Sequence, residues 1–432
     1  PLPASAQADI TEILISSNTT PEDMIRWFSQ GCQFIDSPKY FLKQMHGGPC
    51  GVLAAIQAEM LKSLYFGDGK ESASAASSDS TETLIADLSV DRVQHHFTTS
   101  LFNIFKRAVS DSDILMIFCE LGNISAGVWP QNMHVQRISD EVQFRRFIAE
   151  HMPVYESMSG CILLTMSLLL TRGIENVLSD MDDRGNGLIG SFGHCNQELV
   201  NLLLTGCATS NVFDGTKPLG DSGLVLKGVQ DRSDVGYLTH LESMRYCQVG
   251  SFYKNPNYPI WVVGSSSHFT VLFSLDSRVN AETDEEMLLS RVKREFRQAD
   301  YEENGYIPVD RLGEVLTALS IDVQEMTVEE FNSLKLLLDP ESCGIILFGV
   351  FWSVVSQLMS GTRIDQLLEA FSSKVGSSAQ SSSAMAVDQP LVPTKRERSD
   401  SEIARALQDE WNNDSDMSIS APTSLPEPTT AP

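Results

Sequence analysis

A rigid turn that runs directly into a buried helix is the feature that most constrains the fold. Apolar residues at positions 52, 53, 56, 60, 61 and 64 recur with the 3.6-residue period of an α-helix that packs in a core. Gly47, Gly48 and Pro49 precede this segment and form a sterically open turn. Cys50 stands at the junction, so we expect it at the N-terminus of the helix.

A cysteine at a helix N-terminus has a chemistry that other buried cysteines lack. Free backbone N–H groups and the positive end of the helix dipole favour a thiolate over a thiol there. Neighbouring glycines also let a substrate backbone come close. Cys50 is therefore a candidate nucleophile of a cysteine hydrolase. The alternative is a structural cysteine that follows an ordinary Gly-Pro turn.

A thiolate nucleophile needs a base, and His268 is the best placed of the eight histidines. Residues 258–263 and 268–273 are two β-rich runs separated by a Gly/Ser turn, which predicts a hairpin or two neighbouring strands. His268 would then lie at a strand end, where its side chain can face a cleft. The alternative is a structural histidine, because sequence spacing does not show which residues meet in space. Asp276 is a candidate to orient the imidazole, or an ordinary strand-end residue.

Gln44 is the candidate for a third role, six residues before Cys50. A side-chain amide in that position can donate a hydrogen bond to the oxyanion that forms when a thiolate attacks a carbonyl. From the residues alone, the alternative is a surface glutamine without a catalytic function.

Composition changes along the chain predict three parts. Residues 1–275 are the expected body, and a Gly/Ser/Ala-rich stretch at 67–83 within it indicates a flexible surface insert. Residues 276–371 begin with a charged amphipathic helix, expected at 282–299, and continue with further helices. Ser, Pro, Ala and Thr dominate residues 372–432, which we expect to be a disordered tail.

The helix expected at 282–299 is followed by a calcium-loop pattern that lacks its main carboxylate. Asp300, Glu302 and Asn304 occupy loop positions 1, 3 and 5, but Arg311 stands at position 12, where an EF-hand carries a bidentate glutamate. A poorer second match begins at Asp339. We interpret the pair as a structural EF-hand-like module and expect neither a bound metal nor a cofactor. A real calcium sensor is the alternative.

Charge and cysteine usage exclude several classes of protein. The 31 basic and 57 acidic residues give a net charge of −26, which argues against nucleic-acid binding because phosphate backbones need a basic surface. The acid excess is densest between 276 and 371, with 8 basic and 19 acidic residues. The eight cysteines form no C-x-x-C pair, which indicates the reduced thiols of an intracellular protein, nuclear or cytoplasmic. The longest apolar runs, 161–170 and 345–355, are too short to span a bilayer, so we expect no membrane partner. We also expect a monomer.

These motifs together resemble the MINDY family of cysteine deubiquitinases, which are ubiquitin carboxyl-terminal hydrolases. The resemblance covers roughly residues 25–360 and is greatest for the branch with an EF-hand-like insertion, the FAM188 type. It rests on Gln44, residues 47–50, 197–206, 247–250, 259–263 and 267–273.

The resemblance implies an α/β (α+β) fold with a papain-like cysteine protease core, an inserted all-α EF-hand-like module and a disordered tail. It implies that Cys50 is the nucleophile, His268 the general base and Gln44 the oxyanion donor. The implied activity is that of a thiol-dependent ubiquitinyl hydrolase, which cleaves isopeptide bonds in polyubiquitin, preferentially lysine-forty-eight-linked, through a thioester. An inactive ubiquitin-binding scaffold and a calcium-linked adaptor are the alternatives.

The tail contains one segment that resembles an inverted ubiquitin-interacting helix. Residues 399–402 resemble a capping box, which would start a helix that we expect at 399–411. The residues that would contact ubiquitin are Ile403, Ala404, Leu407 and Glu410. A small alanine allows close approach to an apolar patch, and acidic residues complement a basic rim. A chance match is the alternative.

Overall fold

The computed structural model divides the chain into two units, Pro1–Phe371 and Ser372–Pro432. It describes residues 1–16, 19–45, 47–67, 88–110, 113–219, 223–265, 268–300, 304–324 and 326–370. Most of the expected insert (68–83), Glu302 of the expected calcium loop, and the whole tail lie outside the described residues. The expected helix at 399–411, with Ile403, Ala404, Leu407 and Glu410, is part of that tail.

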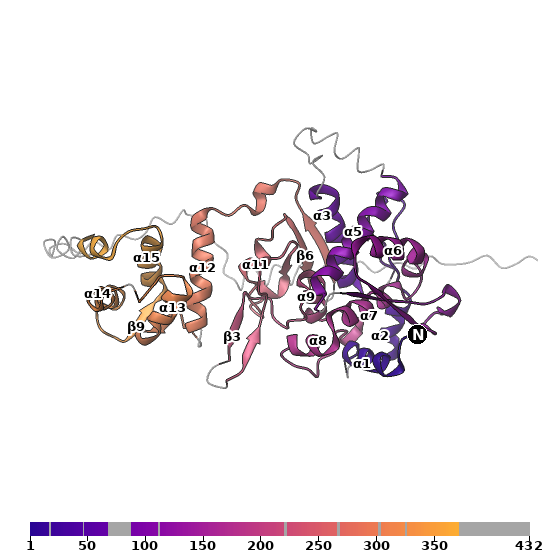
Figure 1. Ribbon diagram of the computed structural model, residues 1–432, viewed down its shortest axis with the longest axis horizontal. Helices are drawn as coiled ribbons and strands as arrows, with labels where there is room; N and C mark the ends of the chain where they lie inside the picture. Colours follow the sequence, from indigo (N-terminus) through magenta and orange to yellow (C-terminus); the bar gives the residue numbers. More distant parts are fainter. Residues whose placement is uncertain are drawn as a thin grey trace, which may run out of the picture. The chain divides into compact units, whose positions relative to one another are not determined.

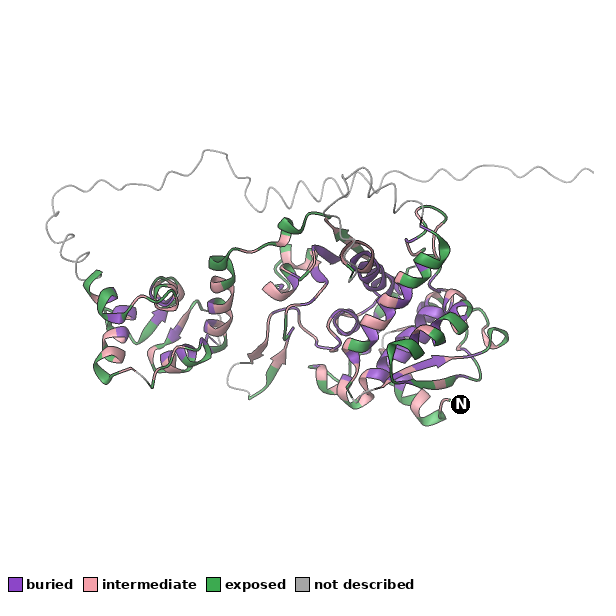
Figure 2. Ribbon diagram, turned by 45° about the horizontal axis from the view of Figure 1, so that its top comes forward, coloured by how far each residue is buried: buried purple, intermediate pink, exposed green. Residues whose placement is uncertain are grey.

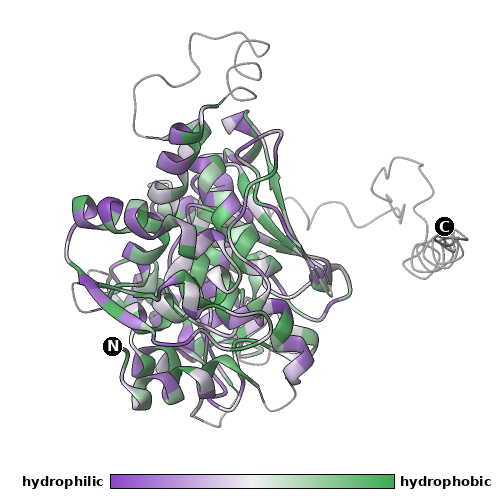
Figure 3. Cartoon of the chain, turned by 90° about the vertical axis from the view of Figure 1, so that its right-hand side faces the viewer, coloured by the Kyte–Doolittle hydropathy of each residue, from purple (hydrophilic) through white to green (hydrophobic). Residues whose placement is uncertain are grey.

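The N-terminal part of the first unit is mostly helical (Figure 1). Its longer helices are α1 (Ala4–Leu14), α2 (Pro21–Phe28), α3 (Cys50–Phe66), α5 (Val90–Ala108), α6 (Glu141–Glu156), α7 (Gly160–Arg172), α8 (Ile174–Asp180) and α9 (Gln197–Thr205). Helices at its periphery alternate hydrophilic and hydrophobic residues around their turns (Figure 3). This alternation is typical of helices that bury one face and solvate the other.

Helix α3 lies in the core, as its apolar period predicts. Every residue from Cys50 to Lys62 is buried, and the helix packs against α5, α9 and two strands, β6 (Ile260–Gly264) and β7 (Phe269–Phe273). Figure 2 shows this part of the chain as a continuous buried region. Each fully buried aliphatic side chain, such as Ile56 and Leu61, contributes about 1.5–3 kcal/mol to folding.

Glu59 is the exception in this helix, because its fully buried side chain is charged. Its carboxylate is neutralised by Lys62 at 2.8 Å and by Arg107 of α5 at 2.6 Å. Lys62 also reaches Asp234 at 2.8 Å. This paired network connects α3 to α5 and to the segment before the central sheet.

A three-stranded sheet with the order β5-β6-β7 packs against α3. Strand β5 (Gly236–Thr239) is parallel to β6, with Gly236 opposite Trp261. Strands β6 and β7 are antiparallel, with Gly264 opposite Phe269. The hairpin predicted from the two β-rich runs is therefore confirmed. Strand β7 is an edge strand of this sheet, and His268 directly precedes it.

Smaller pairs of strands complete the N-terminal part. Strand β1 (Ile114–Phe118) pairs antiparallel with β2 (His134–Ile138), and β3 (Thr216–Pro218) pairs antiparallel with β4 (Val225–Lys227). Short helices α10 (His240–Ser243) and α11 (Ser251–Lys254) lie between β5 and β6 in the chain. The mixture of helices and small sheets is an α+β fold, as expected.

Residues 284–370 have a second hydrophobic core, centred on side chains such as Phe296 and Phe351. The elements are α12 (Asp284–Ala299), β8 (Tyr306–Pro308), α13 (Leu312–Ala318), α14 (Val328–Leu338), β9 (Ile345–Leu347) and α15 (Phe348–Met359). They form two helix-loop-helix units whose loops are joined by antiparallel pairing of β8 with β9. The expectation of an all-α module is therefore wrong in one respect, since Ile307 and Ile346 pair as strand residues in its centre.

Within the described residues, no single helix is long and apolar enough to cross a membrane, although α7 and α8, bent by 86° at their junction, together meet the length and composition required.

Candidate active site

Cys50 is the first residue of α3, and its side chain is buried. Its thiol lies 3.6 Å from the carbonyl oxygen of Gly48, to which it can donate a hydrogen bond. Gly48 has a φ of +127°, a conformation that favours glycine, and a Cβ there would lie 3.1 Å from the Cβ of Arg26. The turn therefore needs a glycine both for its backbone and for its close packing against α2. The prediction that Cys50 begins a helix is confirmed.

The environment of Cys50 differs from the one that its position alone predicts. Burial raises the pKa of the Cys50 thiol, while the backbone amides of Phe269 and Gly51 act in the opposite direction. The helix amides therefore act in the expected direction, and burial opposes them with the larger effect.

His268 immediately precedes β7, the strand that packs against α3. The backbone N–H of Phe269, the first residue of β7, is close enough to lower the pKa of the Cys50 thiol. The preceding turn is held by hydrogen bonds from Ser265 N to His268 O, 2.8 Å, and from His268 N to Ser265 Oγ, 3.1 Å. The His268 side chain itself is exposed. The fold thus brings the start of β7, and His268 with it, to the N-terminal end of α3.

Gln44 is exposed, but the backbone on both sides of it is fixed by a buried side chain. Gln30, fully buried, donates from Nε2 to Lys43 O at 2.9 Å and accepts from Met45 N at 2.7 Å. These two hydrogen bonds set the path of the chain immediately before the Gly-Gly-Pro turn. Sequence reasoning did not single out Gln30, because nothing in its local pattern distinguishes it from a surface glutamine.

Two further residues near Cys50, His194 and Cys195, were also missed. Cys195 is buried, and its Sγ lies 3.8 Å from the same Gly48 carbonyl oxygen that Cys50 contacts. Burial raises the pKa of the Cys195 thiol, and the nearby Cys50 adds to this effect. A Cβ on Gly51 would lie 2.9 Å from the Cys195 Sγ, so close packing here requires glycine in the first turn of α3.

His194 faces the same region. Burial lowers the pKa of His194, and the charges of Arg26 and His268 add to this effect. Its Nδ1 is buried and has no hydrogen-bond partner among the described residues. The loop that carries it is fixed to α2, since Trp27 Nε1 donates to Gly193 O at 2.8 Å and Arg26 donates to Phe192 O at 2.9 Å. No motif or spacing links this loop to Cys50, so only the fold reveals it.

Asp276 is engaged elsewhere in the structure. Its carboxylate lies 2.7 Å from the guanidinium of Arg278, and hydrogen bonds from Arg278 lower the pKa of Asp276 to about 2. Both side chains are largely solvent-exposed. The carboxylate therefore holds a local turn after β7.

The two loops of the 284–370 part use their first carboxylates to order the backbone. Asp300 accepts hydrogen bonds from Asn304 N at 3.0 Å and Gly305 N at 2.8 Å. The second loop repeats this arrangement, with Asp339 accepting from Cys343 N and Gly344 N. In the part of the chain that the structure describes, no group of three or more His, Cys, Asp or Glu side chains is placed to hold a metal ion.

Comparisons with known proteins match this chain to one family. Residues 11–292 match the family described as "Deubiquitinating enzyme MINDY-3/4, conserved domain". The chain is 33% identical over 368 residues to the ubiquitin carboxyl-terminal hydrolase MINDY-3 of Homo sapiens. The match covers 79% of this chain and 80% of the relative. For the Danio rerio protein of the same name the identity is 31% over 430 residues, 92% and 93% of the two chains.

A second type of relative matches over a shorter range. The probable ubiquitin carboxyl-terminal hydrolase MINDY-4 of Bos taurus is 38% identical over 288 residues, which are 63% of this chain and 36% of the relative. No solved structure matches the chain.

Proposed function

Because the chain belongs to the MINDY-3/4 family of deubiquitinating enzymes, we propose that it hydrolyses isopeptide bonds in polyubiquitin with Cys50 as its nucleophile. The observation that carries this proposal is the packing of α3, which begins at Cys50, against β7, which begins directly after His268. It associates the N-terminus of α3 with the residue that follows His268. A nucleophile at the start of a core helix, with a histidine on the adjacent sheet, is also the basis on which we propose a papain-like organisation of the core.

In the first step, His268 accepts the proton of the Cys50 thiol, and the resulting thiolate attacks the carbonyl carbon at the ubiquitin C-terminus. The C–N bond to the substrate lysine breaks, and His268 returns the proton to the departing amine. In the second step, water attacks the thioester while His268 accepts a proton, and free ubiquitin and the Cys50 thiol are regenerated. Both steps pass through a tetrahedral oxyanion.

The oxyanion needs donors at the helix N-terminus. The backbone N–H of Cys50 belongs to the first turn of α3, whose amides have no partner within the helix. The Gln44 side-chain amide is the proposed second donor, and the Gln30 hydrogen bonds that fix residues 43 and 45 position it. Loss of one such donor typically lowers kcat by about 10²–10³.

A general base suits this site because burial raises the pKa of the Cys50 thiol. A protonated thiol is a weak nucleophile, so proton transfer to His268 must accompany the attack. Exposure of the His268 side chain fits this function, since an exposed imidazole can both accept a proton and release it to a leaving group.

We propose that residues 284–370 are an EF-hand-like module without a calcium site. Two helix-loop-helix units joined through β8 and β9 support this interpretation. Arg311 replaces the bidentate glutamate that calcium binding needs.

The preference for lysine-forty-eight-linked chains and a ubiquitin contact by the 399–411 segment are further proposals. To test the ubiquitin contact, residues 395–413 are deleted, which should weaken binding to long ubiquitin chains and leave Cys50 reactivity intact. Unchanged affinity for long chains would contradict the proposed contact.

The test is cleavage of lysine-forty-eight-linked tetraubiquitin by the wild type and by Cys50→Ala. The wild type should release shorter chains, and Cys50→Ala should leave the tetramer intact. Cys343→Ala is the matched control, because it removes an exposed thiol far from α3 in sequence and should retain full activity. Tetramers of other linkages test the linkage preference. Intact tetramer with the wild type, or equal cleavage by wild type and Cys50→Ala, would contradict the proposal.

A further inference from the structure

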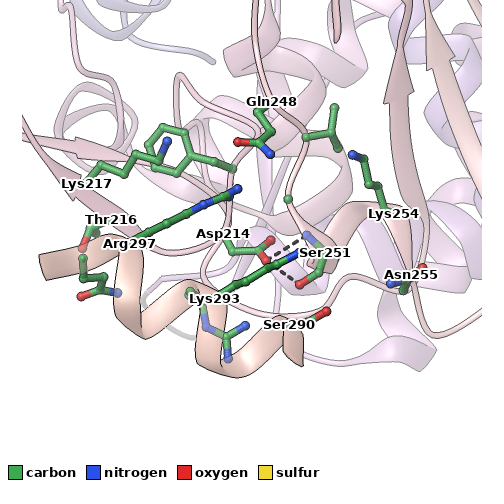
Figure 4. A pocket seen from close by; sticks show the side chains of 15 residues that line it. Asp214, Thr216, Lys217, Gln248, Ser251, Lys254, Asn255, Ser290, Lys293 and Arg297 are labelled. Carbon is green, nitrogen blue, oxygen red and sulfur yellow. Dashed lines mark hydrogen bonds between the residues drawn. The ribbon is translucent and has the colours of Figure 1, made fainter. Parts of the chain in front are cut away.

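A cationic pocket lies on the side of α12 that faces away from its own core. It has a volume of about 230 Å³ and is lined by α12 and by residues from 213–217 and 248–255 (Figure 4). Its positively charged lining residues are Lys217, Lys254, Lys293, Arg294 and Arg297. Among the described lining residues, Asp214 is the single carboxylate. In a chain of net charge −26, this gathering of cations is not what composition alone predicts.

Asp214 contributes one negative charge to the wall, and its two oxygens accept hydrogen bonds from residues of α11. Oδ2 accepts from Ser251 N at 2.8 Å and from Ser251 Oγ at 2.5 Å, and Oδ1 accepts from Phe252 N at 2.9 Å. A Cβ on Gly250 would lie 2.0 Å from Oδ1, so the chain is shaped around this carboxylate. Asp214 is therefore a structural residue of the pocket wall.

Lys254, Arg294 and Lys217 each form an ion pair or lie over an aromatic ring beside the pocket. Lys254 pairs with Glu242 at 2.7 Å. Arg294 pairs with Glu295 at 3.4 Å and lies over the Phe252 ring at 4.6 Å from its centroid. Lys217 lies over the Phe213 ring at 4.5 Å. These contacts hold the three side chains around the pocket.

Lys293 and Arg297 form no ion pair with any residue that the structure describes, and Lys293 Nζ lies 6.0 Å from the centroid of the Phe348 ring. They are four positions apart on α12 and therefore share a face of the helix, where like charges repel. Val292 and Phe296 pack in the core of the 284–370 part, whereas Lys293 and Arg297 line the pocket. Figure 4 shows both side chains extending from α12 into the pocket.

We propose that this pocket binds a compact, multiply phosphorylated small molecule that contacts Lys293 and Arg297. A guanidinium binds phosphate through two parallel hydrogen bonds, and a lysine adds a point charge. Ser290, Thr216 and Gln248 supply neutral donors in the same wall. The volume is below the range of about 300–1,000 Å³ typical for drug-sized ligands, which favours a small polyanion. This inference does not depend on the proposed hydrolase activity.

Free polyphosphates and phosphoinositide head groups share this chemistry. Three segments of the chain (213–217, 248–255 and α12) form the pocket walls, which favours a free molecule over a head group held in a bilayer. The probe is therefore inositol trisphosphate, titrated calorimetrically into the full chain at low ionic strength. Vesicles that contain phosphatidylinositol bisphosphate are the second arm. We expect saturable binding of one soluble probe molecule per chain. Binding to vesicles alone, or no binding at all, would overturn the proposal.

The variants separate a specific site from general charge. Lys293→Gln/Arg297→Gln should weaken inositol trisphosphate binding at least about tenfold. Arg146→Gln/Arg363→Gln, which removes two exposed positive charges elsewhere, should bind within about twofold of the wild type. Lys293→Arg/Arg297→Lys should retain binding. All variants should unfold at the wild-type temperature without ligand, which shows that they are folded. An equal loss of inositol trisphosphate affinity in Lys293→Gln/Arg297→Gln and Arg146→Gln/Arg363→Gln would then show nonspecific attraction and overturn the assignment.

Discussion

The backbone amide of Phe269 acts on the thiol of Cys50 and lowers its pKa, although β7 and α3 are separated by most of the N-terminal part of the chain. The contact depends on the packing of α3 against β6 and β7, which the buried face of the helix drives. It places the start of β7, directly after His268, near the positive end of the helix. Cysteine hydrolase chemistry needs this combination of a helix N-terminus, a base and open glycines.

Replacement of His268 should remove the base without disturbing the fold. Because its side chain is exposed, His268→Gln should unfold at the wild-type temperature while ubiquitin-chain hydrolysis falls by about 10²–10⁴. Initial rates of tetraubiquitin cleavage and a thermal unfolding curve measure the two effects. His134→Gln, another exposed histidine, is the control and should retain activity. Activity of His268→Gln within tenfold of wild type would exclude the assigned function.

The pH dependence of Cys50 alkylation follows from the direction of its pKa shift. Burial raises the pKa of the thiol, so the reactive thiolate is scarce at neutral pH and increases as the pH rises through the alkaline range. Alkylation of the free enzyme by iodoacetamide, followed at the Cys50 peptide by mass spectrometry, should therefore accelerate steadily above pH 8. A rate that is already constant from pH 6 to pH 8 would indicate a resting thiolate–imidazolium pair and contradict the neutral thiol.

Glu59 supplies a test of the fold itself. Its carboxylate is fully buried between Lys62 and Arg107, so Glu59→Gln leaves two cations without their shared partner. Breaking a buried pair in this way typically costs about 3–5 kcal/mol. Denaturant unfolding measures the loss, with Glu150→Gln as the control, since its exposed pair with Arg146 is worth about 0–1 kcal/mol. Equal stability of the two variants would mean that the network does not hold α3 to α5.

Calcium should have little affinity for the 284–370 part. Arg311 takes the place of the main ligand, and Asp300 already accepts hydrogen bonds from Asn304 N and Gly305 N. Calorimetric titration of the full chain should detect no site tighter than about 10⁻³ M. Arg311→Glu restores the missing carboxylate and serves as the comparison. Micromolar binding by the wild type would refute the interpretation of these loops.

The elements with strong local patterns could be predicted from the sequence. The helix at Cys50 has a continuous apolar period, the 258–273 hairpin has β-rich runs around a Gly/Ser turn, and α12 has a capping box formed by Thr283 and Glu286. Each of these is determined by residues close together in the chain, so a short window of sequence contains the information.

The surroundings of the site could not be predicted in this way. Cys195 and His194 reach the region of Cys50 only through the packing of a loop against α2. The shift of the Cys50 pKa depends on how completely the fold removes water, which no helix position specifies. Lys293 and Arg297 share a helix face by sequence, but the wall opposite them comes from residues 213–217 and 248–255. Tertiary structure alone brings these groups together.

The central claim is that Cys50 attacks the C-terminal carbonyl of ubiquitin. Ubiquitin carrying a C-terminal electrophile measures this directly, because the adduct is covalent and its position can be found by peptide mass spectrometry. The wild type should gain the mass of one ubiquitin on the peptide that contains Cys50, and Cys50→Ala should gain none. An adduct on Cys195 or another thiol, or a wild-type protein that stays unlabelled, would contradict the account.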